Sequence, residues 1–126
     1  VRTLANERVR ILGHVPDVRP LFEACRLSVA PLRYGAGVKG KVNQSLAYGL
    51  PVVATSQAVE GMFLVDGQSV LVGDTPTDFA EAVGHVYQDR DLWERLSRNG
   101  LQVVEEHFGF RAARRAIADV AGLTEA

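Results

Sequence analysis

Residues 27–48 read LSVAPLRYGAGVKGKVNQSLAY, and this stretch decides the fold. The apolar run 27–32 predicts a buried strand, and residues 40–48 predict a helix. Residues 34–41, which lead from the strand into the start of the helix, contain three glycines and two lysines. Glycine lets the backbone approach a ligand closely, and lysine adds positive charge beside the N–H groups of a helix N-terminus. The stretch therefore predicts a strand, a phosphate-binding loop and a helix in succession.

The loop partly matches the dinucleotide fingerprint G-x-G-x-x-G. Gly35, Gly37 and Gly40 occupy its three glycine positions, and Glu60 follows at roughly the 20-residue distance of a ribose-binding acid. A ribose-binding acid normally sits at the end of the next strand. That strand is predicted at 51–55, so Glu60 lies too far beyond its end. An NAD-dependent oxidoreductase domain is therefore an alternative with a loose fit.

The loop also partly matches a P-loop. Residues 35–41 follow the pattern G-x-x-x-x-G-K, but the next residue, Val42, has no hydroxyl group to hold Mg²⁺. An ATPase would therefore lack its metal ligand. What the two motifs share is an anion held by backbone amides and a helix dipole, and this is the chemistry that we predict.

The composition is that of one globular domain or a piece of one. The chain has 126 residues, of which 47% are hydrophobic and 23% charged. A formal net charge of −1 gives no overall attraction to nucleic acid. Cys25, the single cysteine, lies among apolar residues, which predicts a packing role and a reducing compartment. No apolar run reaches the length of a membrane span and no leader opens the chain, so we expect a soluble, cytoplasmic protein.

Residues 1–74 are predicted to form a parallel α/β part. Strands that alternate with helices at short intervals pair in parallel, and ligands bind beyond the carboxyl ends of such strands. We expect His14, the loop 33–41 and the segment 56–62 at that edge, the last within a loop-rich stretch 56–69. The expected strands are 9–15, 27–32, 51–55 and 70–72, and the expected helices are 21–26 and 40–48.

Residues 75–126 are predicted to form a helical tail within the same domain, 1–126. Thr75 or Thr77 is expected to cap the first helix, and Asp91 the second. The pair Asn99-Gly100 predicts a break or kink in that second helix. The helices are expected to end near residue 87, to run from 91 to 104, and to run from 111 to 120.

Few residues suggest catalysis or metal binding. The cysteine is isolated, and the histidines at 14, 85 and 107 are too scattered to share a metal, so we predict no structural metal. No serine or cysteine has a recognisable base beside it, which leaves a hydrolase without support. Glu60 is either a functional acid or a cap of its own loop. The catalytic residues are not identified.

The run from Ala30 to Thr55, APLRYGAGVKGKVNQSLAYGLPVVAT, resembles the donor-binding half of retaining GT-B glycosyltransferases, family 4, the glycosyl transferases group 1. The segment 49–55 is the most specific part, and the similarity extends from Leu12 to the closing helices. The resemblance implies a three-layer Rossmann-like α/β fold with a parallel sheet and a helical C-terminal tail. The sheet would be incomplete at its N-terminal side, because the family's catalytic group, acceptor site and first diphosphate-binding strand come earlier in the chain.

The resemblance also implies a donor site. In the family, amides of the glycine loop hold the sugar and diphosphate, and two acids spaced E-x7-E hold the hexose and the ribose. Those two acidic positions fall on Ala36 and Gln44, so both acids are missing here, and Lys39 and Lys41 would meet the diphosphate in place of a metal. The implied donor-binding residues are Gly13, His14, Gly35, Ala36, Gly37, Val38, Lys39, Gly40, Lys41, Gln44 and Glu60.

The function implied by the resemblance is that of a hexosyltransferase in polysaccharide or glycoconjugate synthesis. The donor would be a nucleotide-sugar, and neither a cofactor nor a metal would be required. The missing partner would be an N-terminal acceptor-binding domain, without which this part would be inactive, and peripheral association with a membrane stays open. Besides the oxidoreductase, the absent acids leave a second alternative, a degenerate, non-catalytic interaction module.

Overall fold

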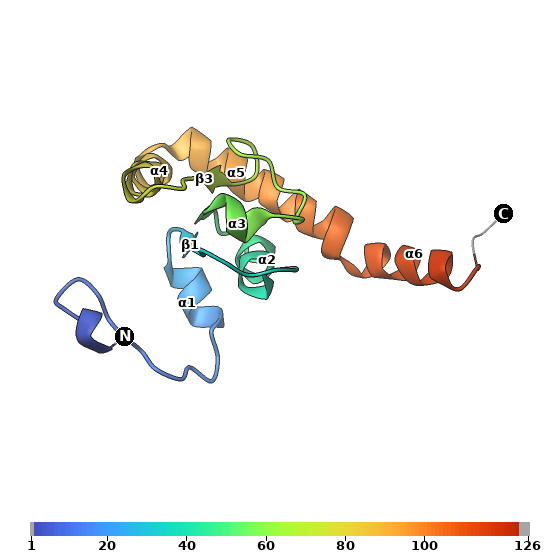
Figure 1. Ribbon diagram of the computed structural model, residues 1–126, viewed down its shortest axis with the longest axis horizontal. Helices are drawn as coiled ribbons and strands as arrows, with labels where there is room; N and C mark the ends of the chain where they lie inside the picture. The colour runs from blue at the N-terminus through green and yellow to red at the C-terminus, as the bar shows by residue number, and fades with distance from the viewer. Residues whose placement is uncertain (1, 124–126) are drawn as a thin grey trace.

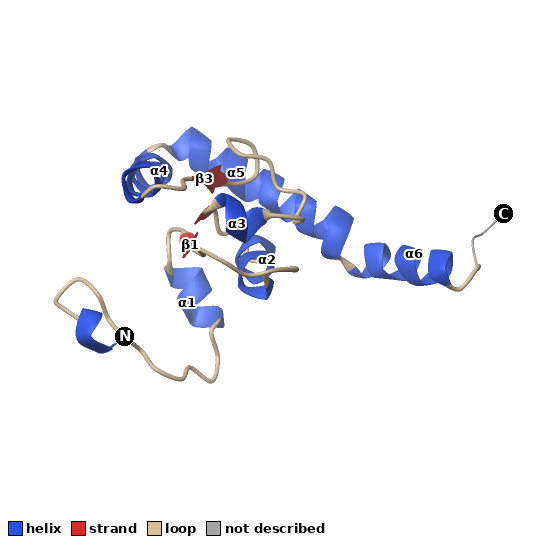
Figure 2. Cartoon of the chain, viewed as in Figure 1, coloured by secondary structure: helices blue, strands red, loops and turns tan. Residues whose placement is uncertain are grey.

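A computed structural model of the protein describes residues 2–123 (Figures 1 and 2). Short strands alternate with helices up to residue 72, and helices follow from there, as predicted. The elements in chain order are η1 (Arg2–Leu4), α1 (Arg19–Ala24), β1 (Ser28–Ala30), α2 (Gly40–Ala47), β2 (Val52–Ala54), α3 (Ser56–Val59), β3 (Leu71–Val72), α4 (Pro76–Gln88), α5 (Arg90–Val103), the π-helix η2 (Val104–Phe108) and α6 (Phe110–Val120).

The three strands form a parallel sheet in the order β1-β2-β3. All three residues of the central strand β2 are buried. Successive side chains of a strand point to opposite sides, so β2 is covered on both faces. Val52 and Ala54 pack in a cluster with Val42 and Leu46 of α2. Val53 packs on the other face, in a cluster whose members come mainly from α4 and α5. The α/β fold with helical layers on both faces of a parallel sheet is therefore confirmed.

The predicted strand at 9–15 is wrong. The structure has no strand there, only an isolated antiparallel bridge between Asn6 and Val9. Ile11 and Leu12 remain exposed. A strand needs a neighbour to receive its backbone hydrogen bonds, and among the described residues β1 pairs only with β2. The apolar pattern is present, but within residues 2–123 this segment pairs with none of the three strands of the sheet.

Helix α5 continues through the predicted break at Asn99-Gly100. Gly100 is buried, and a Cβ atom built on it would lie 2.7 Å from Cδ2 of Leu46. The glycine therefore allows α5 to lie close to α2 and does not end the helix. Asn99 donates a hydrogen bond to the Gln68 carbonyl at 2.8 Å, which also ties α5 to the turn before β3.

Three smaller predictions are corrected by local hydrogen bonds and exposure. Thr75 caps α4 as predicted, but Asp89 and not Asp91 caps α5, since its carboxylate accepts from the Leu92 amide at 3.0 Å. The loop-rich stretch 56–69 begins with a short helix, α3. Cys25 is exposed, because it follows the last turn of α1 on the outside of the molecule.

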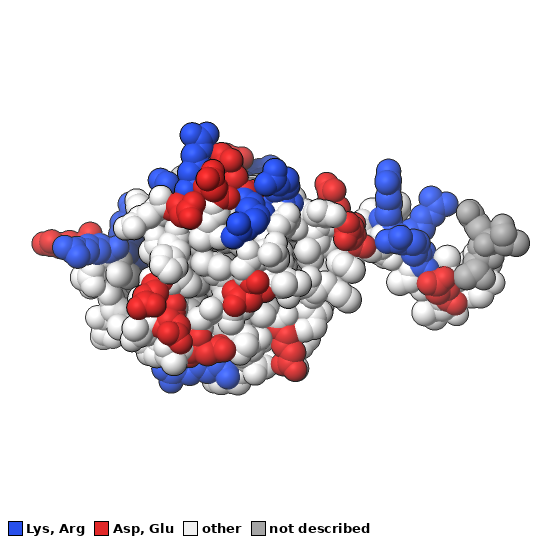
Figure 3. All heavy atoms as spheres, turned by 90° about the horizontal axis from the view of Figure 1, so that it is seen from above, with Lys and Arg blue, Asp and Glu red and all other residues white. Residues whose placement is uncertain are grey.

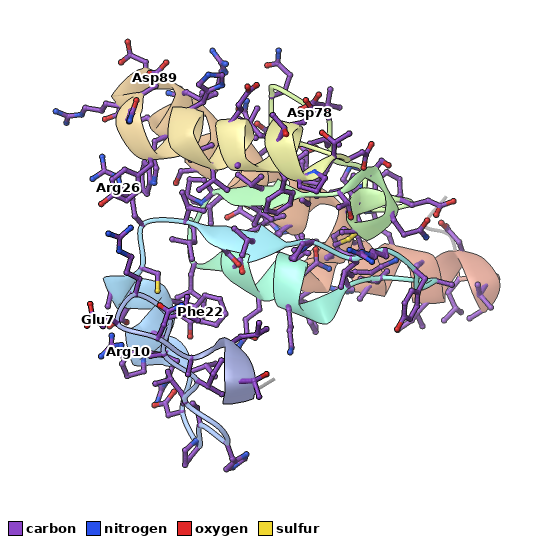
Figure 4. The ribbon with its side chains drawn as sticks, turned by 60° about the vertical axis from the view of Figure 1, so that its left-hand side comes forward. Glu7, Arg10, Phe22, Arg26, Asp78 and Asp89 are labelled. Atoms are coloured by element: carbon purple, nitrogen blue, oxygen red, sulfur yellow. The ribbon has the colours of Figure 1, made fainter. Side chains whose placement is uncertain are left out.

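Two parts of the chain extend from this body. The segment before α1 lies at the lower left of Figure 1, and α6 projects to the right, attached through η2. Figure 4 shows Arg26 between α1 and the turn that carries Asp89, and the Arg26 guanidinium lies 4.7 Å from the centre of the Tyr87 ring. Within residues 2–123, no helix is long and apolar enough to cross a membrane.

Candidate donor-binding site

The glycine loop connects β1 to α2 at the carboxyl edge of the sheet. Lys39 precedes α2 in an extended conformation, and its carbonyl accepts from the amides of Val42 and Asn43. The amides of residues 35–41, by contrast, donate no hydrogen bond to any described group. Consecutive N–H groups without partners at a helix start carry partial positive charge. The geometry is that of an anion-binding loop.

Two of the loop glycines have backbone conformations that side chains disfavour. Gly35 has φ +133° and Gly37 has φ +78°. No heavy atom lies within 4 Å of a Cβ atom built on Gly37 or Gly40, so the space in front of these residues is open. The loop therefore presents bare backbone to solvent.

The residues after β2 fasten both neighbouring loops. The Thr55 hydroxyl donates to the Leu32 carbonyl, at the start of the glycine loop. Ser56 donates from its amide and its hydroxyl to one oxygen of Asp74, at 2.8 and 2.9 Å, and Asp74 follows β3. The carboxyl ends of all three strands are thus linked by side chains of one turn.

The two lysines of the loop have different surroundings. Nζ of Lys39 donates to the Gly37 carbonyl at 2.7 Å, so this side chain braces the loop from within. Lys41 is exposed on the first turn of α2, and no hydrogen bond or ion pair joins its ammonium to the described residues. The Lys41 ammonium is therefore free to meet a ligand.

The positions of the two missing acids are both exposed. Ala36 offers its backbone only, and Gln44 lies on α2 with its carboxamide accessible. Between Lys41 and Gln44, Oδ1 of Asn43 is buried without a hydrogen-bond partner among residues 2–123. Gln44 can donate and accept hydrogen bonds, but it carries no charge to strengthen them.

The structure brings Glu60 to the loop through Gln57. Nε2 of Gln57 donates to the Gly35 carbonyl at 2.8 Å and lies 3.2 Å from Oε2 of Glu60. Glu60 is the residue that ends α3. A ribose-binding acid of the dinucleotide fingerprint would instead lie at the end of β2. Sequence analysis missed Gln57, because a lone glutamine in a loop-rich segment carries no spacing signal.

Gly13 and His14 are not brought to the loop. They are exposed and belong to the segment before α1, which lies away from α2 and from the loop that enters it (Figure 1). The backbone contact predicted for them depended on the strand at 9–15, which this chain does not form.

Charges around the body are mixed. On the face shown in Figure 3, acidic and basic side chains are mixed along the upper edge, mainly acidic ones lie below it, and basic ones project from α6. Three of these are Arg111, Arg114 and Arg115, with Asp119 on the same helix. Among the residues that the structure describes, no three His, Cys, Asp or Glu side chains gather as metal ligands.

Comparisons with known proteins agree with this geometry. A family model described as "Glycosyl transferases group 1" matches residues 1–89. The chain belongs to this family. The chain is 30% identical over 115 residues to the lipopolysaccharide core biosynthesis glycosyltransferase LpsE of Rhizobium meliloti (strain 1021). That alignment covers 89% of the chain but 32% of LpsE, so the chain spans about a third of this relative's length.

A solved structure shows the same fold. The chain matches the C-terminal domain of LpcC, a glycosyl transferase group 1 family protein of Francisella tularensis, with a TM-score of 0.68 and 16% identity. The match covers 79% of this chain and 53% of that one. The fold is therefore that of a GT-B C-terminal domain, and the family favours a glycosyltransferase over the oxidoreductase alternative.

Proposed function

We propose that the protein transfers a sugar from a nucleotide-sugar donor and that the glycine loop of this chain holds the donor's diphosphate. The observation that carries the proposal is the row of unpartnered amides at residues 35–41, at the start of α2 and the carboxyl edge of the sheet. A diphosphate is the anion that such a row of amides binds well. Membership of the glycosyl transferases group 1 supports the same assignment.

The leaving group of the proposed reaction is the nucleoside diphosphate, so the group that the loop binds is also the one that departs. Negative charge develops on it as the bond to the sugar breaks, so preorganised amides and Lys41 stabilise the transition state more than the ground state. Lys39 adds a second charge behind the loop. These groups perform the work that a divalent metal does elsewhere, and we propose that the donor binds without one. Gln44 lies one helical turn further along α2, and we propose that it bonds a ribose hydroxyl.

The acceptor is proposed from the relative's name. LpsE is named for lipopolysaccharide core biosynthesis, which supports a glycoconjugate acceptor and a hexosyltransferase of family 4 type. Because the chain spans a third of LpsE, we propose that the acceptor site and the catalytic group lie in another domain of the whole protein. This chain alone would then bind donor but transfer no sugar. We assign the reaction to the cytoplasm, since the single exposed cysteine suits a reducing compartment.

The test is transfer by the whole protein with Lys41→Ala. Nucleoside diphosphate release is measured from a panel of UDP-, GDP- and ADP-sugars, with lipopolysaccharide core as acceptor. Losing a charge-assisted contact costs about 1.5–3 kcal/mol, so kcat/KM should fall roughly 10- to 100-fold. Arg98→Ala is the matched control, because it removes the same charge from an exposed site on α5. Equal activity of wild type and Lys41→Ala would rule out the loop as the diphosphate site.

A further inference from the structure

Gln57 makes the link between the glycine loop and α3. Its side chain is half-buried at the carboxyl edge of the sheet, and its NH₂ group is shared between two acceptors. One is the carbonyl of Gly35 at 2.8 Å, and the other is the carboxylate of Glu60 at 3.2 Å. A carboxamide has two N–H hydrogens, so both contacts are satisfied by one nitrogen.

Holding a carbonyl also orients an amide. In a trans peptide the C=O of one residue and the N–H of the next point in opposite directions within one plane, and no cis peptide is present among the described residues. When Gln57 holds the Gly35 carbonyl on the α3 side, the Ala36 N–H must point away from α3. Lys39 acts in the same way on the Gly37 carbonyl and so on the Val38 N–H. Both amides belong to the unpartnered row.

The same nitrogen fixes the position of a carboxylate. Because Gly35 O and Oε2 of Glu60 contact one atom, these two oxygens can be no more than about 6 Å apart. Glu60 is exposed, and its other oxygen makes no bond to a described residue. A nucleotide-sugar carries hydroxyl groups beside its diphosphate, and a carboxylate is a strong acceptor for hydroxyl donors.

We propose that Gln57 is a positioning residue of the donor site: it orients the Ala36 amide toward the diphosphate and holds the Glu60 carboxylate where a sugar hydroxyl can donate to it. This inference rests on the proposed function and deepens it. It assigns amides to the diphosphate and Glu60 to the sugar, in a loop that itself contains no acid. Gln57 has no reacting atom and acts only through the groups that it holds.

The experiment measures binding to the whole protein by calorimetry, with inorganic pyrophosphate and with the nucleotide-sugar of the panel that wild type binds most tightly. Gln57→Met keeps length and neutrality but donates no hydrogen bond. It should weaken binding of both ligands about 5- to 10-fold, the value of one hydrogen bond of roughly 1 kcal/mol. Glu60→Gln keeps an acceptor for Gln57 but loses the charge. It should bind pyrophosphate within twofold of wild type and the nucleotide-sugar about 10-fold more weakly.

Thermal unfolding separates these effects from a folding defect, and Gln57→Ala repeats the test if Gln57→Met is unstable. If wild type binds the panel and pyrophosphate while Gln57→Met binds them equally well, the positioning role is overturned and the proposed function stands. If Glu60→Gln binds the nucleotide-sugar as wild type does, the assignment of Glu60 to the sugar is overturned. Should wild type bind none of these ligands, the proposed function and this inference both fail.

Discussion

Gly73 lies directly against the backbone of Phe79, so that a Cβ atom on Gly73 would be 2.6 Å from the Phe79 Cα. The Gly73 amide donates to the Ala54 carbonyl at 3.0 Å, which extends the sheet one residue past β3. The start of α4 is therefore packed on the strand end with no room for a side chain. Asp74, the residue that holds Ser56, follows immediately, so this contact also fixes the position of the carboxylate that links the end of β3 to the turn after β2.

Replacing Gly73 by alanine should therefore destabilise the protein. The added methyl meets backbone atoms, which cannot rotate away, and overpacking of this kind costs about 1–3 kcal/mol. Chemical denaturation measures the loss. Gly84→Ala is the matched control, since Gly84 lies inside α4 with nothing within 4 Å of its Cβ position. That change should stabilise by up to about 1 kcal/mol through helix propensity, and a similar loss in both variants would contradict the packing argument.

The helix caps give a second matched pair. The Asp89 carboxylate accepts a hydrogen bond from the Leu92 amide at 3.0 Å. Asp91 lies in the first turn, where its charge interacts favourably with the helix dipole but caps no amide. Asp89→Ala should cost about 1 kcal/mol of unfolding free energy, and Asp91→Ala about 0.3–1 kcal/mol. The comparison is made by urea denaturation at low ionic strength. A larger effect at Asp91 would restore the cap that the sequence pattern predicted.

Much of the fold could be predicted because local signals and tertiary packing agree. The pattern from residue 27 to 55 gives strand, loop, helix and strand, and each is present within a few residues of its predicted bounds. The segment 9–15 has an equally good apolar pattern, but it pairs with none of the described strands, and no local signal reveals that. Gly100 shows the converse: a helix-breaking residue is retained because Leu46 occupies the space of its side chain.

Some features of the candidate site could likewise be predicted from the sequence, and others could not. The glycine loop could be predicted, because glycine and lysine at these spacings have local consequences for backbone conformation and charge. The role of Gln57 could not, since it depends on how α3 approaches the Gly35 carbonyl 22 residues away. The exposure of Gly13 and His14 could not be predicted either, because it follows from the missing strand pairing.

Acid should weaken one surface contact in a defined direction. The Arg19 side chain donates to Asp17, and this hydrogen bond holds the pKa of Asp17 below its ordinary value. A lowered pKa in the folded state means that the contact stabilises the protein above the unfolded-state pKa of about 4 and is lost as the pH falls through the folded-state pKa. Melting temperatures measured between about pH 5 and pH 2 should therefore fall more steeply for wild type than for Asp17→Asn.

The size of this difference is expected to be small, because both side chains are exposed and water screens the pair. The same scans in high salt provide the control, since added ions should bring the two slopes together. Parallel slopes at low salt would show that the contact contributes nothing to folding.

Replacing each of the two loop lysines by methionine should have different effects on pyrophosphate binding. Lys41→Met removes a charge and leaves the loop braced, because no described group depends on its ammonium. Lys39→Met removes the same charge and also releases the Gly37 carbonyl, which frees the Val38 amide to turn away from the ligand. Pyrophosphate affinity of the whole protein, measured by calorimetry, should therefore fall further for Lys39→Met, by about 5-fold beyond the loss in Lys41→Met.

The dependence of pyrophosphate affinity on salt distinguishes the two contributions. The part of the affinity loss that comes from the missing charge becomes smaller at high ionic strength, whereas the part that comes from the altered loop geometry persists. If both variants converge on wild-type affinity in high salt, the Lys39 contact with Gly37 does not shape the loop, and only its charge matters.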